Sequence, residues 1–119
     1  MNERSARWNA FDEAMGEASR QVGEGDAAGA FRSLERAHVL GQSRFGPHVR
    51  VHVAMLRVAW SRRDGREISG QCLRLALVPL GHLVGRLPLG NTGGANVSAF
   101  APMPIPPDLE RLMDDKTNP

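Results

Sequence analysis

The 119-residue sequence contains one cysteine and no tyrosine, and aromatic residues make up only 5% of it. Because a single cysteine, Cys72, cannot form an internal disulfide, a fold stabilised by internal disulfides is excluded, which fits a reducing compartment but does not require one. No apolar stretch reaches the roughly 18 uninterrupted residues of a membrane-spanning helix. The N-terminal stretch carries charges throughout and lacks the apolar region of a secretory signal. We therefore expect a cytoplasmic protein without a membrane partner.

The sequence also lacks a large excess of charge of either sign. Fifteen Lys and Arg against thirteen Asp and Glu leave a formal net charge of only +2. Such a slight excess does not indicate a nucleic-acid-binding surface, so nucleic acid is not an expected partner. Hydrophobic residues (41%) and charged residues (24%) occur at ordinary globular frequencies. The length suits one hydrophobic core, which predicts a single domain over residues 1–119.

Four segments have apolar residues at the three-and-four spacing of an amphipathic helix. The predicted helices cover residues 4–22, Asp26 (as N-cap) to Gly41, Pro47 to about Arg63, and about Arg66 onward. The predicted inward faces are Trp8, Phe11, Met15, Ala18 and Val22; Ala27, Phe31, Leu34 and His38; His48, His52, Met55 or Leu56, and Ala59; and Ile68, Cys72, Leu75, Pro79 and His82. Pro79 removes a helical hydrogen bond, so a kink or an early end is expected there.

These patterns predict an all-α fold with a helical core over residues 4–86. Short loops favour four antiparallel helices arranged as two stacked helical hairpins, either tetratricopeptide-like or as a four-helix bundle. Residues 87–119 are rich in glycine and proline, and we expect an irregular segment with a short helix near 107–113. The glycine-rich part lacks the preceding strand and following helix of a phosphate loop. A tight loop with left-handed glycines is expected instead, folded over one end of the helices.

Histidines give the clearest functional signal. Three of the four lie within Leu34–His52, LERAHVLGQSRFGPHVRVH, as Glu35-x-x-His38 and His48-x-x-x-His52. Both spacings place two side chains on one face of a helix. In an antiparallel arrangement the second helix ends where the third begins, and the fourth returns to that end. We therefore expect His38, His48, His52 and His82 to meet at one end of the domain, with Glu35 at the same level.

Imidazoles four residues apart on a helix can bind one metal ion, and a nearby carboxylate can add a ligand. The sequence thus predicts a transition-metal site with His38, His48, His52, His82 and Glu35 as ligands, for zinc, copper, iron or nickel. A single Glu-x-x-His motif disfavours a dinuclear iron centre. The competing interpretation is that each histidine is a hydrogen-bonded core residue, or a residue that complements the negative end of a helix dipole.

Three segments resemble a family of short bacterial proteins catalogued as a domain of unknown function. They are LERAHVLGQ at 34–42, HVRVH at 48–52 and GRLPLGNTGGANVS at 85–98. The resemblance covers about residues 10–112 and implies a bacterial, single-domain, cytoplasmic protein. It implies no activity.

Two functions are compatible with these patterns. The first is a small metal-binding protein that handles metal or uses it in catalysis, with Glu35 as a possible base. The second is a helical interaction module without metal, whose groove would be lined by the aromatic residues of the first helix and by the proline-rich tail. It would receive a peptide or a second copy in a homodimer.

Overall fold

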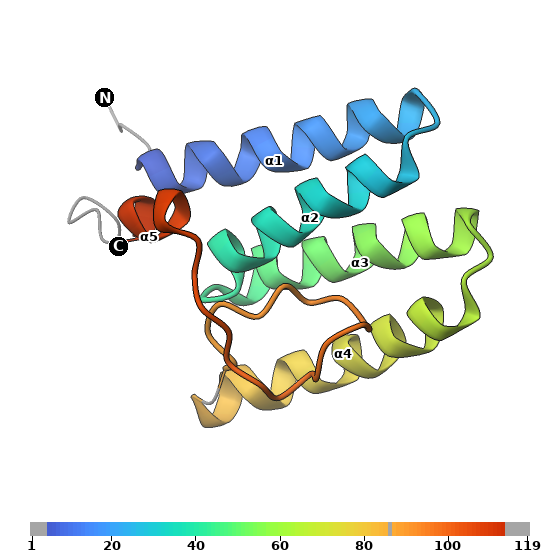
Figure 1. Ribbon diagram of the computed structural model, residues 1–119. Coiled ribbons are helices and arrows are strands. Elements are labelled where there is room, and N and C mark those ends of the chain that lie inside the picture. Colours follow the sequence, from blue (N-terminus) through green and yellow to red (C-terminus); the bar gives the residue numbers. More distant parts are fainter. Residues whose placement is uncertain (1–4, 86, 114–119) are drawn as a thin grey trace.

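The computed structural model describes residues 5–85 and 87–113, and all regular structure in these residues is helical. The helices are α1 (Ala6–Gly23), α2 (Ala27–Gly41), α3 (Phe45–Ser61), α4 (Gly65–Val84) and α5 (Pro107–Met113). From α1 to α4 the chain direction alternates from one helix to the next, with short turns between them (Figure 1). The predicted all-α fold is confirmed, and α5 has the predicted bounds.

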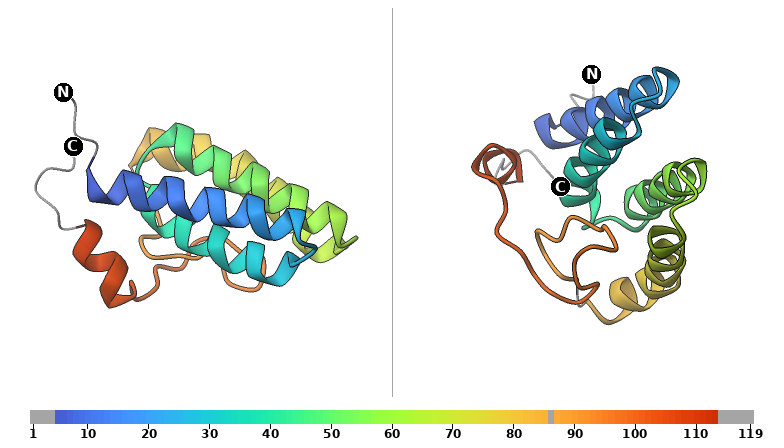
Figure 2. Two further views of the ribbon diagram at one scale, coloured as in Figure 1. Left: turned by 90° about the horizontal axis from the view of Figure 1, so that it is seen from above. Right: turned by 45° about the vertical axis from the view of Figure 1, so that its right-hand side comes forward.

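The four long helices form a curved array. α1 packs most extensively on α2 and α3 on α4, while contacts between α2 and α3 join the two pairs. The irregular segment that follows α4 lies in the hollow of this curve (Figure 2). A tetratricopeptide-like relationship between the pairs stays a prediction, because two hairpins are too few to define a solenoid.

Side chains at the helix starts explain several boundaries. Asp26 accepts a hydrogen bond of 2.8 Å from the backbone N–H of Gly29, as its predicted role at the start of the second helix requires. Asp64 does the same for Glu67 at the start of α4. α4 ends at Gly85, whose φ of 69° lies in the left-handed region that glycine adopts without strain. The turns that orient the helices are therefore encoded locally.

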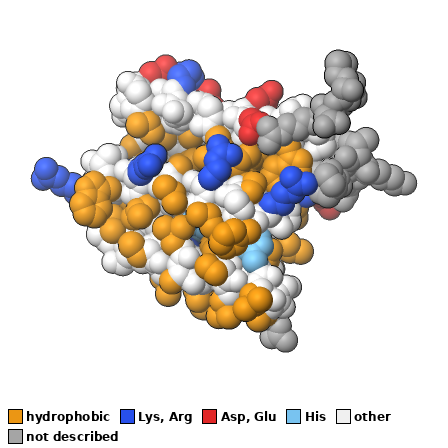
Figure 3. Space-filling model, turned by 180° about the vertical axis from the view of Figure 1, so that it is seen from behind, with side chains coloured by type: hydrophobic (Ala, Val, Ile, Leu, Met, Phe, Trp, Pro, Cys, Tyr) orange, Lys and Arg blue, Asp and Glu red, His pale blue; other side chains and the backbone are white. Residues whose placement is uncertain are grey.

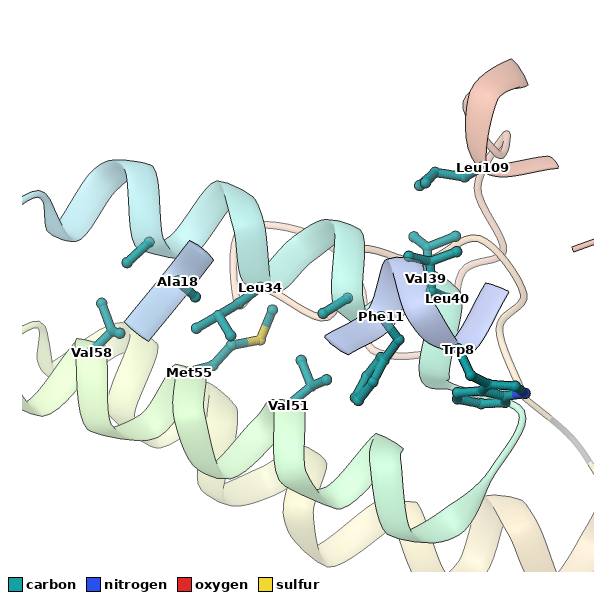
Figure 4. Close-up of a cluster of buried hydrophobic side chains, with 12 residues drawn as sticks. Trp8, Phe11, Ala18, Leu34, Val39, Leu40, Val51, Met55, Val58 and Leu109 are labelled. Atoms are coloured by element: carbon teal, nitrogen blue, oxygen red, sulfur yellow. The ribbon is translucent and has the colours of Figure 1, made fainter. Parts of the chain in front are cut away.

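The hydrophobic core lies where α1, α2 and α3 meet (Figure 4). Phe11, Leu34 and Met55 are among its fully buried side chains, one from each helix. Leu109 of α5 also joins the core, and Arg36 of α2 forms a 2.9 Å ion pair with Asp108. The C-terminal segment is thereby attached to the helices at its far end.

The predicted groove lined by aromatic residues of the first helix is wrong. Trp8 is 3% exposed and Phe11 is 0% exposed, so both rings are used in the core. Arg7 next to them donates a 2.8 Å hydrogen bond to the carbonyl of Leu40 and ties the start of α1 to the end of α2. The aromatic rings of α1 are therefore part of the core and are not available to line a groove.

The predicted early end and the predicted inward face of the fourth helix are also wrong, whereas the alternative of a kink at Pro79 stays a prediction. α4 continues five residues past Pro79, so there is no early end. Pro79 is exposed, where water can satisfy the carbonyl group that the proline leaves unbonded. The buried face consists of Gln71, Arg74 and Val78, whereas Cys72 is exposed. The buried face lies one residue before the predicted face at each of these positions. Because it is mostly polar, a pattern of hydrophobic residues does not reveal it.

Within the described residues, no helix combines the length and the apolar character that crossing a lipid bilayer requires.

Candidate metal centre

The end of α2, the start of α3 and the second half of α4 meet at one end of the array. A short turn at residues 42–44 joins α2 to α3, so His38 near the end of α2 faces the first turns of α3. There His48 and His52 lie four residues apart on the buried face. All three histidines are at most 4% exposed. Local helix boundaries therefore deliver three buried imidazoles to one place.

The three imidazole rings converge through the same ring atom. Nε2 of His38 lies 3.1 Å from Nε2 of His48 and 3.1 Å from Nε2 of His52. One potential ligand atom from each of the three residues lies within 4.8 Å of the other two. Such a group can hold a metal ion, because imidazole nitrogen is a common ligand of transition metals.

The opposite nitrogen of His38 fixes its protonation. Nδ1 lies 2.6 Å from the backbone carbonyl oxygen of Asn91. A carbonyl oxygen can only accept, so Nδ1 must carry the hydrogen. In the neutral ring, Nε2 then presents a lone pair to the other histidines.

His52 is held in the same way by a side chain. Its Nδ1 lies 2.7 Å from Oε1 of Gln71. The amide orientation of Gln71 is itself fixed, because Nε2 of Gln71 donates to Glu67 and to the carbonyl of Gly93. Oε1 of Gln71 therefore accepts from Nδ1 of His52, and Nε2 of His52 also presents a lone pair.

These assignments bring two lone pairs face to face. Neutral His38 and His52 each present an acceptor nitrogen to the other across 3.1 Å, with no hydrogen to share between them. Two acceptors at this distance repel each other, and a cation placed between them removes the repulsion. The outer hydrogen bonds therefore favour a cation at the centre of the cluster.

His82 approaches the cluster from outside. Its Nε2 lies 2.9 Å from Nδ1 of His48, on the side of the His48 ring that faces away from the other two histidines. When Nδ1 of His48 donates to His82, Nε2 of His48 supplies the third inward lone pair. The structure thus brings all four predicted histidines together but gives His82 a different contact from the other three.

Glu35 is not one of the residues in the compact histidine group. Its pKa is raised, chiefly by partial burial and then by the nearby charge of Glu67, while Arg32 and Thr92 act in the opposite direction. The carboxylate therefore lies near Glu67 and Thr92, at the edge of the glycine-rich loop.

Burial keeps the three clustered imidazoles neutral. It lowers the pKa of His38 well below its ordinary value, and His52 and His48 add to the effect. Burial, followed by His52 and His82, lowers the pKa of His48 to about 3. The pKa of His52 is also lowered by burial, against the opposing effect of the hydrogen bond that His52 donates to Gln71. At neutral pH the three rings are therefore unprotonated, as metal ligands must be.

The glycine-rich loop covers the cluster, as the sequence predicted. Gly90 and Gly93 have left-handed φ values of 78° and 86°. Asn91 fixes the turn by accepting a 2.8 Å hydrogen bond from the N–H of Gly93 and donating to the carbonyls of Ser98 and Ala101. The loop thus places the Asn91 carbonyl against His38.

Gly93 touches the site so closely that a side chain does not fit. A Cβ at this position would lie 2.6 to 2.9 Å from ring atoms of His38, and φ is 86°. We expect Gly93→Ala to lower the free energy of unfolding of the metal-free protein by at least about 1–2 kcal/mol, the usual cost of a left-handed non-glycine residue. Denaturant unfolding measures this change.

The matched control is Gly16→Ala on the exposed side of α1, where a Cβ meets nothing within 4 Å. There alanine is expected to raise the free energy of unfolding by about 0.5–1 kcal/mol, because it favours the helix. Equal changes in the two variants would contradict the close packing of Gly93 on His38.

A cavity of about 210 Å³ adjoins the three imidazoles. The wall opposite the histidines comes from the second half of α4 and from the loop at residues 87–100, and most of it is apolar. Arg74 is the charged exception. A ligand bound between the histidines would therefore have access to a mainly hydrophobic space.

Sequence reasoning missed the residues of α4 and of the loop that surround the histidines. Gln71 and Arg74 were not expected at the site because the predicted inward face of α4 was one residue out of register. The spacing of Gln71, Val78 and His82 was a usable signal. Val78 follows Gln71 by seven residues, or two helical turns, and His82 follows Val78 by four, so the three side chains share one face of α4. The role of Asn91 had no such signal, because its backbone carbonyl is the contacting group.

Comparison with known proteins gives one match. A family model described as "Protein of unknown function (DUF3703)" matches residues 5–113. No curated protein and no solved structure matches the chain. The matched region includes the three histidine-bearing helix ends and the loop that covers the histidines.

Proposed function

The chain belongs to the DUF3703 family, whose description names no activity, and we propose that it binds a transition-metal ion through Nε2 of His38, His48 and His52. The observation that carries this proposal is the orientation of the rings. Each Nε2 points inward while each Nδ1 has a hydrogen-bond partner on the outside. Metal-binding histidines typically have this arrangement, because the outer bond fixes the tautomer and the ring orientation.

The spacing of the nitrogens supports the same proposal. Two nitrogens bound to one zinc ion at about 2.0–2.1 Å and a tetrahedral angle lie roughly 3.3 Å apart. The separations of 3.1 Å between Nε2 of His38 and Nε2 of His48 and of His52 are close to this value. Two of the three pairs of nitrogens therefore already have the spacing that one ion requires, and the third pair lies within 4.8 Å.

The ligand set suits zinc, copper, iron or nickel, because neutral imidazole is accepted by all four. Cys72 is exposed on α4 and does not line the cavity, so the proposed site contains no thiolate. Three protein ligands leave a fourth position for water or another molecule. Metal handling and metal-dependent catalysis both use such a site. In this proposal His82 orients His48, and Glu35 is a more distant outer group.

Metal analysis tests the proposal. Protein purified without a histidine tag is titrated with zinc, copper, iron and nickel and then analysed for bound metal. We expect one ion per chain and a higher melting temperature, since an ion at 100 times its Kd adds about 2.7 kcal/mol to stability. Failure of all four ions to bind stoichiometrically, with unchanged melting temperatures, would contradict the proposal.

A second candidate is a helical interaction module without metal. It is favoured by large apolar side chains on the surface, among them Leu83, Phe100 and Trp60, which are 83%, 73% and 70% exposed. Sedimentation at increasing protein concentration tests for the homodimer. A protein that binds no metal and dimerises at micromolar concentration would favour this candidate.

A further inference from the structure

We propose that the cavity beside the three histidines binds a small organic anion with an apolar body, such as an aromatic or short-chain carboxylate. Its negative group would lie between the open position of the metal and the guanidinium of Arg74. This inference rests on the proposed metal site and names the class of molecule that the site accepts.

Arg74 supplies the first reason. It is 7% exposed and lines the same cavity as the histidines. Its Nη1 donates to the carbonyl of Gly70 and its Nη2 to the carbonyl of Val97, at 3.1 and 2.6 Å. Its Nε is buried and has no hydrogen-bond acceptor among the described residues. A guanidinium keeps its charge in proteins, so one N–H of a buried cation needs an acceptor.

Among residues 5–85 and 87–113, no carboxylate meets this need. Arg74 forms no ion pair in the part of the chain that the structure describes. Glu67 is near enough to influence it electrostatically, but both oxygens of Glu67 accept hydrogen bonds from the backbone N–H of Ala95, and one also accepts from Gln71. An anion in the cavity that Arg74 lines can therefore supply a negative charge beside the guanidinium.

The charge of the loaded site is the second reason. A divalent ion on three neutral imidazoles keeps its full charge, and Arg74 adds another positive charge on the same cavity wall. Arg74, His38 and His52 line the same cavity, so a ligand there lies between both positive charges. Buried charge without a partner is costly, so a negative ligand stabilises the loaded site.

The cavity wall supplies the third reason. Val78, Leu87 and Phe100 are among its apolar lining residues. An engineered apolar cavity of about 150 Å³ holds benzene, so 210 Å³ is enough for one ring or a short chain. At the rim, Leu80, Val84 and Phe100 are more than half exposed. Figure 3 shows hydrophobic side chains gathered beside an accessible histidine.

The test uses the full chain loaded with cobalt(II), whose visible absorption reports on its ligands. Benzoate is expected to change the spectrum saturably and to bind at least tenfold more tightly than acetate, which lacks the apolar body. Neutral benzamide, which has the same ring, is expected to bind at least tenfold more weakly than benzoate. Equal binding of benzoate and acetate, or of benzoate and benzamide, would overturn the inference.

Two variants locate the anion. Arg74→Gln is expected to retain one cobalt ion per chain and to lose at least tenfold in benzoate affinity. Because Arg74 also donates a hydrogen bond to the loop carbonyl of Val97, a second variant leaves Arg74 in place. Ala99→Phe fills the cavity and should prevent benzoate binding while leaving the cobalt stoichiometry unchanged. Unchanged benzoate affinity in Ala99→Phe would contradict the assigned cavity.

The two proposals fail in different ways. A protein that takes up one cobalt ion but shows no spectral change with benzoate contradicts this inference and leaves the metal site standing. A protein that takes up no cobalt, zinc, copper, iron or nickel contradicts the metal site and the inference together.

Discussion

His48→Ala is expected to lower the affinity for zinc by more than about 100-fold. Loss of an outer residue that only orients a metal ligand typically costs 10- to 100-fold in affinity, so loss of a ligand should cost more. Nε2 of His48 is one of the three converging atoms, 3.1 Å from that of His38. Competition with a chromophoric chelator measures the affinity of each variant.

His82→Ala is the matched comparison, because His82 is the hydrogen-bond partner of His48 and has the same side chain. We expect a loss of about tenfold, since the His48 ring would stay in place but lose its outer contact. A loss in His82→Ala as large as that in His48→Ala would make His82 a ligand, as the sequence first predicted. An unchanged affinity in His48→Ala would contradict the proposed site.

The metal-free protein is expected to lose stability steeply as the pH falls below about 6.5. The three clustered histidines have pKa values below the ordinary one in the folded state, and that of His48 is lowered to about 3. At a pH between the lowered pKa of a histidine in the folded chain and its ordinary pKa in the unfolded chain, the unfolded chain binds a proton that the folded chain does not. The stability contributed by the neutral rings is therefore present above pH 6.5 and is lost as the pH falls.

The size of this effect follows from the number of histidines. Each one contributes about 1.4 kcal/mol per pH unit in the interval where only the unfolded chain is protonated. His48, with a folded-state pKa of about 3, accounts for one such contribution, and His38 and His52 add to it over the pH range where they stay neutral in the folded chain. Urea unfolding at pH 7.5 and 5.5 in the presence of a chelator measures the difference.

His48→Gln provides the control for the pH effect, because glutamine does not titrate. The slope of stability against pH should fall by about 1.4 kcal/mol per unit in this variant. A stability that stays constant between pH 7.5 and 5.5 in the unsubstituted protein would show that the histidines are accessible to protons in the folded state.

Much of the architecture follows from local sequence signals. Asp26 begins a helix because its side chain binds the N–H of Gly29, and Gly85 ends another in a left-handed conformation. The meeting of His38 with His48 follows from the short turn between two antiparallel helices. His82 reaches the same end because α4 runs back along α3 (Figure 1). These features depend on spacing and turns, which a single sequence records.

The environment of the histidines could not be predicted in the same way. The inward face of α4 carries Gln71 and Arg74, and buried polar residues do not produce a hydrophobic stripe. The contact to His38 comes from the backbone carbonyl of Asn91, which any residue could provide. The division of the four histidines into three that converge and one behind them also depends on ring orientation. Sequence spacing determines which rings are near, and tertiary contacts determine which nitrogen points inward.

The central claim is that Nε2 of His38, His48 and His52 together bind one metal ion. Nitrogen NMR of the histidine rings during a zinc titration tests it most directly, because the spectra distinguish Nδ1 from Nε2 in each ring. With one equivalent of zinc, the Nε2 signals of these three residues should shift together, while Nδ1 of His38 and His52 keeps its hydrogen. Unshifted Nε2 signals, or zinc bound through Nδ1 of any of the three, would contradict the claim.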